Sequence, residues 1–468
     1  MRLATCLLFF AALPLSAQPA IPEKDGKVSV PIQLTPNAAP KPLSDFALLV
    51  DYGEKQPGEQ VGGFLKCFME QERFFAQDEQ EKRLKYLSLP LKDVPVSVGV
   101  ENGIAYKPKY ASMMVMIDQA ARFNRTEWNE YFNLRNDGAY MLIPEVQRLR
   151  LLALVVHLRL RQELKAEEFD KAVVSVRTLF ALAHLLESHP TLIGGFVGLS
   201  MASMAVNGLE EMIGQPKCPN LYWNLADLPS PFLSLRSGLG GEKTFFKAQF
   251  AKTLPGDNAM SDKELGAAFQ IIAELQRMSG PVVLGEKPGV KYPLLAANDK
   301  LLDGVRARLK ADGVDAATIK DLPKLQLAVL ADAHRYFETR DELFKWLNRP
   351  HPEALAGLKS ADEFVAAERK AGWLIGPMFL PSLQKVKQAQ ARLDQRLALL
   401  MALEAIRLHA FEKKALPGKL ADIAVVVPVD PVSGKPFAYE MKDGTATLRP
   451  HTPILKSDNR TYEISLRK

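Results

Sequence analysis

Apolar side chains recur at helical spacing along most of this chain, and that pattern limits the available folds more than any other feature. The clearest case is the stretch 169–188, whose apolar positions are Phe169, Ala172, Val173, Val176, Phe180 and Ala183. Residues three and four apart lie on one side of an α-helix, so this stretch carries an apolar stripe that must be buried. The pattern predicts a mainly α protein made of irregular stacked αα-hairpins.

The same spacing marks the other helices that we expect. They are residues 63–86, 110–123, 145–165, 191–213, 262–278, 300–311, 324–337, 341–347, 361–370 and 383–411. Residues 191–213 and 397–411 are apolar on most sides, so we expect both stretches to be buried in a core. Four prolines between residues 216 and 231 predict only short turns of helix there, because proline interrupts helical hydrogen bonding.

After Pro417 the periodicity changes from helical to β-like. The β-branched or alternating stretches are 425–427, 437–441, 445–448 and 461–466, and Asp443-Gly444 is typical of a hairpin turn. We expect a small C-terminal α+β module of short antiparallel strands. It should pack on the last long helix, since an isolated hairpin is only marginally stable.

The first seventeen residues have the pattern of a secretory signal peptide. Arg2 is followed by the apolar run Leu3–Leu13 and by the small residues Ser16-Ala17. We expect cleavage after Ala17, with Ala20 as the alternative, and a mature protein that is periplasmic or extracellular. No later segment predicts a transmembrane span. A net charge of +6 with 54 acidic residues interspersed does not indicate a nucleic-acid partner.

These features divide the chain into five parts. They are the signal peptide (1–17), a Pro-rich extended arm (18–60), an N-terminal helical lobe (61–280), a C-terminal helical lobe (299–415) and the β-rich module (416–468). The arm is assigned because it contains seven prolines between residues 19 and 57, and proline fixes φ and removes a hydrogen-bond donor. Glycines and prolines between 279 and 298 mark the boundary of the two lobes.

The cysteine content does not define a disulfide framework. Of three cysteines, Cys6 lies in the signal peptide, which leaves Cys67 and Cys218 in the mature chain. An oxidising compartment permits a Cys67–Cys218 disulfide, and two separate buried thiols are the alternative. The sequence leaves both open.

Two sets of motifs resemble a known family. The first set comprises Leu164–Ala172, Pro190–Ile193, Pro219–Trp223 and Leu228–Pro231, and the second comprises Thr35–Pro40, Leu403–Leu408, Leu416–Leu420 and Val427–Phe437. Together they resemble a family of uncharacterised exported helical proteins that is abundant in planctomycete-type bacteria. The resemblance covers most of the mature chain and implies export and a helical fold, but no chemistry.

Two weaker resemblances lie inside this one. The turn Glu168-Phe169-Asp170-Lys171-Ala172 between two amphipathic stretches is similar to a tetratricopeptide-type hairpin, although no 34-residue period repeats it. The last long helix and the following Asp430-Pro431 and Gly434–Tyr439 resemble the globular end of type II secretion pseudopilins. Pseudopilins have their helix at the extreme N-terminus, so the resemblance does not imply pilus assembly.

The sequence contains no motif of a known catalytic or metal site. His-Glu-x-x-His is absent, and His184 and His189 are five residues apart across a helix end, so we expect packing roles for both. His334 and Glu338 are four apart on a helix, a spacing typical of a solvated hydrogen bond. We therefore predict no catalytic residue, no metal site and no cofactor.

Two groups of residues remain as candidates. Asn220, Tyr222, Trp223, Arg236 and Glu242 include the residue types that anchor protein interfaces, and they are our candidate partner-binding residues. Glu404 and Arg407 lie three apart on an otherwise apolar helix, where burying either one alone would be costly. We predict that Glu404 and Arg407 form an internal ion pair; the alternative is the floor of a pocket.

The function hypothesis that follows is an exported, non-enzymatic scaffold or binding protein. Stacked helices offer broad surfaces for protein or peptide partners, here in the cell envelope. The alternative is an exported hydrolase of envelope polymer, because catalytic groups from distant parts of a chain can meet in the folded protein.

Overall fold

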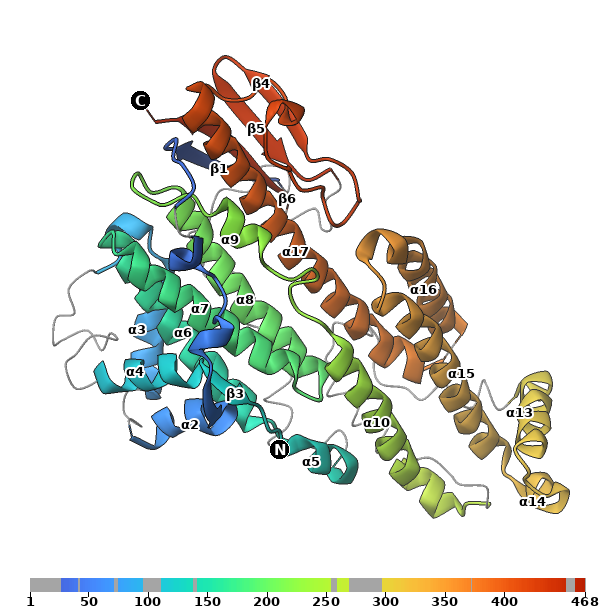
Figure 1. Cartoon of the computed structure of the whole chain (residues 1–468). Coiled ribbons are helices and arrows are strands. Elements are labelled where there is room, and N and C mark those ends of the chain that lie inside the picture. The colour runs from blue at the N-terminus through green and yellow to red at the C-terminus, as the bar shows by residue number, and fades with distance from the viewer. Residues whose placement is uncertain are drawn as a thin grey trace. The chain divides into compact units, whose positions relative to one another are not determined.

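The computed structural model describes residues 27–40, 43–70, 75–95, 111–137, 141–253, 259–268, 297–371, 373–451 and 459–467. The predicted signal peptide and most of the predicted lobe boundary lie outside these residues. The chain is mainly α-helical, with a small sheet of short strands that is largely C-terminal (Figure 1). The prediction of a mainly α fold with a small α+β module is confirmed.

The chain divides into two compact units. Of the described residues, those in 27–128, 143–238 and 388–467 form the sheet unit, and those in 129–142 and 239–387 form the helical unit. Each unit is therefore assembled from segments that are distant in the sequence.

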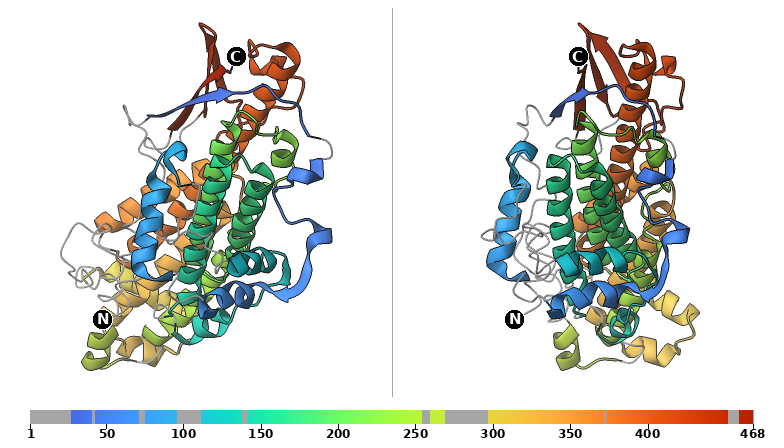
Figure 2. Two further views of the ribbon diagram at one scale, coloured as in Figure 1. Left: turned by 90° about the vertical axis from the view of Figure 1, so that its left-hand side faces the viewer. Right: turned by 60° about the vertical axis from the view of Figure 1, so that its left-hand side comes forward.

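Three antiparallel neighbours form the helical layer of the sheet unit. They are α6 (Pro144–Lys165), α7 (Phe169–Glu187) and α8 (Leu192–Ile213), which lie side by side in the green part of the ribbon (Figure 2). Pro144 occupies the first turn of α6, where a missing N–H costs nothing. Thr191 caps α8, because its hydroxyl accepts the Gly194 N–H at 3.1 Å.

Helix α8 is the central helix of this unit. It is long and apolar enough to cross a membrane by composition, but 72% of its apolar window is buried inside the protein. Two glycines allow its neighbours to come close. A Cβ at Gly198 would lie 2.9 Å from the Ala183 carbonyl oxygen, and one at Gly208 would lie 2.2 Å from Leu160 Cδ2. The expected burial of residues 191–213 is confirmed.

The remaining elements of the sheet unit surround these three helices. They are η1 (Leu43–Phe46), η2 (Tyr52–Glu54), β2 (Gln56–Glu59), α2 (Gln60–Glu70), α3 (Gln77–Ser88), η4 (Leu91–Asp93), α4 (Ala111–Ala120), β3 (Phe123–Arg125), α9 (Tyr222–Ala226), the second part of α17 (Ile375–Lys413) and η7 (Leu420–Asp422). The single helix predicted over 63–86 is two helices, α2 and α3. Strands β2 and β3, which pair in parallel, were not predicted.

The main sheet has the strand order β1-β6-β5-β4. Its strands are β1 (Lys27–Leu34), β4 (Ala438–Lys442), β5 (Thr445–Arg449) and β6 (Asn459–Leu466). β4, β5 and β6 are antiparallel neighbours, as predicted, but the stretch 425–427 is not a strand. The fourth strand is β1 from the Pro-rich arm, which pairs with β6 in parallel from Lys27↔Asn459 to Leu34↔Leu466. Sequence periodicity cannot reveal such a long-range pairing.

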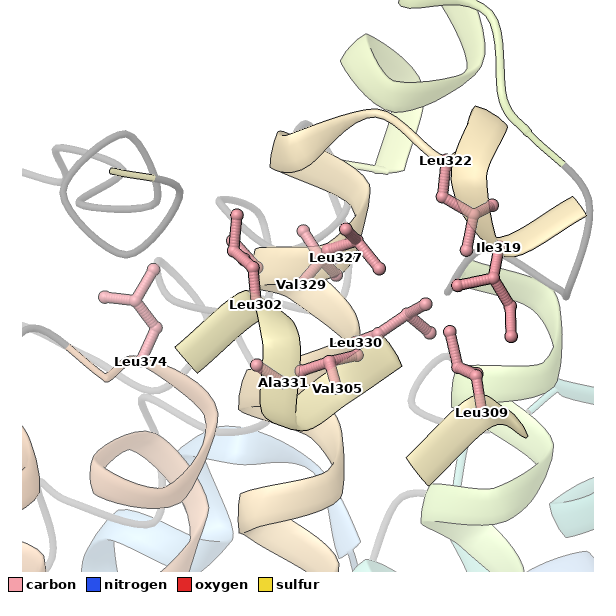
Figure 3. Close-up of a cluster of buried hydrophobic side chains, with 11 residues drawn as sticks. Leu302, Val305, Leu309, Ile319, Leu322, Leu327, Val329, Leu330, Ala331 and Leu374 are labelled. Atoms are coloured by element: carbon pink, nitrogen blue, oxygen red, sulfur yellow. The ribbon is translucent and has the colours of Figure 1, made fainter. Parts of the chain in front are cut away.

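The helical unit is built from α5 (Glu130–Asp137) and from helices that follow one another along the chain from residue 239. The latter are α10 (Arg236–Thr253) from Leu239 onward, α13 (Asp299–Ala311), α14 (Ala316–Asp321), α15 (Lys324–Leu347), α16 (His351–Ala371) and the first part of α17. The two helices predicted over 324–347 are one continuous helix, and α10 was not predicted at all. An apolar cluster from α13, α14 and α15, joined by Leu374, forms a core of this unit (Figure 3).

Candidate functional site

The centre of the candidate site is the ion pair of Glu404 and Arg407 on α17. The Arg407 guanidinium lies 2.8 and 2.9 Å from the two Glu404 carboxylate oxygens, and both side chains are fully buried. Helical spacing places them on one side of α17, so they can pair without bending the helix. The pair is internal to the sheet unit and is present as the sequence indicated.

Arg407 also binds three backbone carbonyls of distant segments. It donates to the Cys218 carbonyl at 2.8 Å, to the Pro219 carbonyl at 3.4 Å and to the Thr35 carbonyl at 3.2 Å. A guanidinium has five N–H donors in a fixed plane, so one arginine can satisfy several otherwise unpaired carbonyls. Arg407 thereby joins the N-terminal arm, the loop after α8 and α17.

Glu404 fixes the same loop from its other side. One of its carboxylate oxygens accepts the Leu221 N–H at 3.1 Å, and its backbone carbonyl accepts the Asn220 amide at 3.0 Å. The Asn220 side-chain oxygen accepts the Tyr222 N–H at 3.0 Å, and the Tyr222 hydroxyl donates to the Val426 carbonyl at 2.7 Å. We call residues Glu404, Arg407, Asn220 and Tyr222, with the carbonyls they bind, the α17 clasp.

Burial and the ion pair together set the pKa values of the groups in and beside the clasp. Burial raises the pKa of the Glu404 carboxyl, although Arg407 opposes it. For Arg407, burial alone lowers the pKa, but the adjacent Glu404 carboxylate outweighs burial and raises it. Burial raises the pKa of the Cys218 thiol to about 12, so this cysteine is a poor nucleophile at neutral pH. Cys67 and Cys218 are both buried and both are thiols.

A second buried carboxylate, Glu210 on α8, binds two side chains of the sheet strand β6. Arg460 of β6 lies 2.6 Å from both Glu210 oxygens, the Tyr462 hydroxyl donates at 2.6 Å, and Arg396 of α17 lies 3.4 Å away. Burial alone raises the pKa of Glu210, but the two arginines outweigh burial and lower it. These contacts fasten β6 and α17 to the central helix.

Two arginines on α6 act in the same way. Arg161 pairs with Glu211 at 2.8 Å. It also donates to the carbonyl of Leu87, in the last turn of α3, and to that of Leu89, just after α3. Arg159 pairs with Asp118 of α4 through two hydrogen bonds, of 2.7 and 2.9 Å. Each arginine is desolvated and pairs with a carboxylate, so these contacts stabilise the positions of elements rather than provide a free charge for a reaction.

The five predicted partner-binding residues do not form one surface. Asn220 and Tyr222 are 0% and 2% exposed, so neither side chain is available to a partner, because both are used in the clasp. Trp223 is 46% exposed and Arg236 is exposed, both in the sheet unit. Glu242 belongs to the helical unit, where its charge acts on buried Tyr336 of α15.

Trp223 is exposed on a rigidly held segment. Its ring stacks edge-to-face with Tyr222, at 4.9 Å between centroids, and Tyr222 is held by the clasp. Val426, whose carbonyl binds the Tyr222 hydroxyl, is 77% exposed. We call Trp223 and Val426 the Trp223 surface. Both side chains are apolar and exposed, and a tryptophan in such a position is typical of an interface anchor.

His184 and His189 have internal partners. The His184 Nδ1 lies 2.8 Å from a Glu187 oxygen, and the His189 Nδ1 lies 2.9 Å from the Thr191 hydroxyl. Glu338 pairs with Arg308 rather than with His334. Among the residues that the structure describes, no three or more His, Cys, Asp or Glu side chains are grouped to hold a metal ion.

Glu210 was interpreted from the sequence, with its neighbour Glu211, as part of a solvated face, but it is buried and paired. Sequence reasoning missed Arg460, Arg161, Arg159 and Asp118. For Arg159 and Arg161 a sequence signal was present, because they interrupt an apolar stretch in α6 as Glu404 and Arg407 do in α17. Apart from Glu163, which lies four residues after Arg159 on α6, their carboxylate partners lie on other elements, so spacing along one helix could not identify them.

Comparisons with known proteins identify no relative of this chain. No family model matches the chain, and neither a curated protein nor a solved structure matches it.

Proposed function

We propose that this chain is an exported, non-enzymatic scaffold or binding protein whose partner is a protein or peptide of the cell envelope. The observation that carries the proposal is Trp223, 46% exposed next to the fully used polar groups of the α17 clasp. A tryptophan held in one place loses little conformational entropy on binding, so it contributes most of its contact energy to the complex.

The helical surface supports the same proposal. The α6–α7 hairpin is the turn that resembles a tetratricopeptide-type unit, and helical stacks of that kind bind polypeptides along their faces. The buried ion pairs keep the segments that carry Trp223 in place without being accessible to solvent. Membership of the planctomycete-type family of exported helical proteins is part of this proposal and rests on the sequence motifs.

The test of binding uses the mature chain immobilised and exposed to the envelope fraction of the organism that encodes it. Trp223→Ala should reduce capture of the enriched protein at least about tenfold, the effect of removing an anchor residue. Tyr52→Ala is the matched control, because Tyr52 is an exposed aromatic of the same unit, 88% exposed, outside the Trp223 surface. Both variants should keep the far-ultraviolet circular dichroism of the parent. Equal capture by all three proteins would overturn the proposal.

Two further measurements test the rest of the proposal. N-terminal sequencing of the protein from the envelope fraction should begin at residue 18 or 21; an unprocessed chain in the cytoplasm would contradict export. A panel of envelope polysaccharides and peptides separates a binder from the hydrolase alternative. Turnover that a single substitution abolishes would establish an enzyme instead.

A further inference from the structure

The turn between α7 and α8 contains a histidine in an unusual position. His189 is 0% exposed, and its Nδ1 accepts the Thr191 N–H at 3.2 Å. A backbone N–H can only donate, so this nitrogen carries no proton and the imidazole is neutral with its proton on Nε2. The Nε2 is buried and, within the described residues, has no hydrogen-bond partner.

The His189 Nδ1 is the last acceptor in a short chain of hydrogen bonds at the start of α8. The Gly194 N–H donates to the Thr191 hydroxyl at 3.1 Å, and that hydroxyl lies 2.9 Å from His189 Nδ1. The hydroxyl therefore directs its own proton at Nδ1. Gly194 lies against the ring, because a Cβ there would be 2.5 Å from the His189 ring atoms. The unprotonated Nδ1 thus supports the N-terminal cap of the central helix.

Trp128 closes over this turn. Its ring meets the His189 ring at 76°, with 4.7 Å between centroids, and its indole N–H donates to the Ser188 hydroxyl at 2.9 Å. The Ser188 hydroxyl in turn donates to the Leu185 carbonyl at 2.7 Å. Trp128 is 8% exposed, and it is the last residue of the first segment of the sheet unit.

We propose that protonation of His189 Nδ1 is a switch that opens this turn and releases Trp128 from it. The added proton converts Nδ1 from an acceptor to a donor that faces the Thr191 N–H and hydroxyl. The hydrogen bond from the Thr191 N–H is lost, the Thr191 hydroxyl must turn from donor to acceptor, and a positive charge is placed beside the positive end of the α8 dipole. The favourable response is local opening, in which the imidazolium reaches water and the indole leaves its buried position.

No neighbouring carboxylate compensates for that charge among the described contacts. Glu187 of α7 is occupied by His184 and by the Ser234 N–H, and Glu127 beside Trp128 lies 3.9 Å from Arg125. The first turn of α8 has no acidic residue, and Arg236 at the start of α10 is exposed and positive.

The size of the effect follows from the change in proton affinity. Burial lowers the pKa of His189 from 6.5 to about 4, although a backbone hydrogen bond with Thr191 opposes it, whereas an opened turn restores the ordinary value. Acid therefore shifts the equilibrium toward the open form. The shift reaches at most about 300-fold below pH 4, since each pKa unit is a factor of ten.

The test follows Trp128 fluorescence in a variant that keeps this tryptophan alone, with Trp223→Phe, Trp346→Phe and Trp373→Phe. Between pH 7.5 and 4, the emission should shift reversibly to longer wavelength while far-ultraviolet circular dichroism stays constant. His189→Gln should abolish the shift, because the glutamine carbonyl can accept the Thr191 N–H but cannot titrate. His157→Gln is the matched control, since His157 is also a buried histidine, and it should leave the shift intact.

Hydrogen exchange provides a second measurement on the chain with all four tryptophans. The peptide covering residues 188–196 should lose protection at acidic pH, after correction for intrinsic rates, and His189→Gln should retain it. A shift that persists in His189→Gln, an unchanged Trp128 environment down to pH 4, or unfolding of the whole chain in the same range would overturn the proposal.

Discussion

The two units of this protein are stabilised by contacts of different range. In the sheet unit, buried charges join distant segments: Arg407 binds the Thr35 carbonyl across 372 residues, and Arg460 binds Glu210 across 250. In the helical unit, the apolar cluster of α13, α14 and α15 comes from residues 302–374, and buried Asp332 accepts the Ile375 N–H at the start of α17, 43 residues away.

The two units therefore differ in how their sequences specify their structures. The cluster of α13, α14 and α15 can be assembled from neighbours in sequence, so the apolar pattern of these helices nearly suffices. The sheet unit must close long loops before its charges are paired, and an unpaired buried charge is strongly unfavourable. The clasp therefore favours one arrangement of distant segments over other compact arrangements, and the following substitutions test that conclusion.

The largest effect should come from breaking the clasp. Arg407→Ala leaves the Glu404 carboxylate buried without its partner and three carbonyls without their donor. The free energy of unfolding of the sheet unit should fall by about 4 kcal/mol, measured by urea denaturation. The exposed pair of Lys217 and Glu167 is the control, and Lys217→Ala should cause no measurable change. A loss below about 1 kcal/mol for Arg407→Ala would contradict the role of the clasp.

An apolar substitution should be nearly as costly in the helical unit. Leu327 is fully buried in its core cluster, so Leu327→Ala creates a cavity and should lower stability by about 3 kcal/mol. Hydrogen exchange of α13 and α15 should report the loss. Leu355→Ala, at a side chain 47% exposed in the same unit, should have little effect. Similar losses in the two variants would show that Leu327 is not part of a tightly packed core.

Acid should weaken the sheet unit through buried histidine. Burial lowers the pKa of His157 on α6 from 6.5 to about 3, with a further contribution from Arg161. The folded pKa lies below the unfolded value, so the unfolded state binds more protons and stability falls as pH drops from about 6.5 toward 3. At pH 5 this histidine should cost about 2 kcal/mol relative to pH 7.5. His157→Gln should remove that part of the pH dependence in denaturation curves; an unaltered dependence would refute the assignment.

The smallest effect should be a gain of stability in the helical unit. Gly304 lies inside α13, and a Cβ built there has no atom within 4 Å. Gly304→Ala should stabilise by about 1 kcal/mol, because alanine loses less backbone entropy in a helix. Gly208→Ala in α8 is the contrasting control and should destabilise, since its Cβ would overlap Leu160. The melting temperature should rise for Gly304→Ala and fall for Gly208→Ala. Changes in the same direction would contradict the open space at Gly304 or the close contact of Gly208 with Leu160.

Local patterning predicted most helices of the fold. The apolar repeat identified α6, α7 and α8 to within a few residues, because a buried face at 3.6-residue spacing is a property of the helix itself. α10 was missed because its glycines and phenylalanines form no clear stripe. The 425–427 stretch was predicted as a strand from its β-branched residues, although a strand also needs a partner.

The candidate site was predicted only where both partners lie on one element. Glu404 and Arg407 share α17, so their spacing was sufficient to suggest a pair. Asn220 and Tyr222 were selected for their chemistry, but their burial depends on the position of α17 and Val426. Residue type alone does not distinguish a side chain that closes a core from one that meets a partner.

The amino-acid sequence by itself determined the helical character of the chain and the turns between consecutive helices, since these depend on residues a few positions apart. Only the tertiary structure decided that β1 completes the C-terminal sheet beside β6 and that Arg407 joins the arm to α17. Those contacts depend on which desolvated polar groups meet across hundreds of residues. That choice is made by the free energy of the whole packed unit rather than by any local propensity.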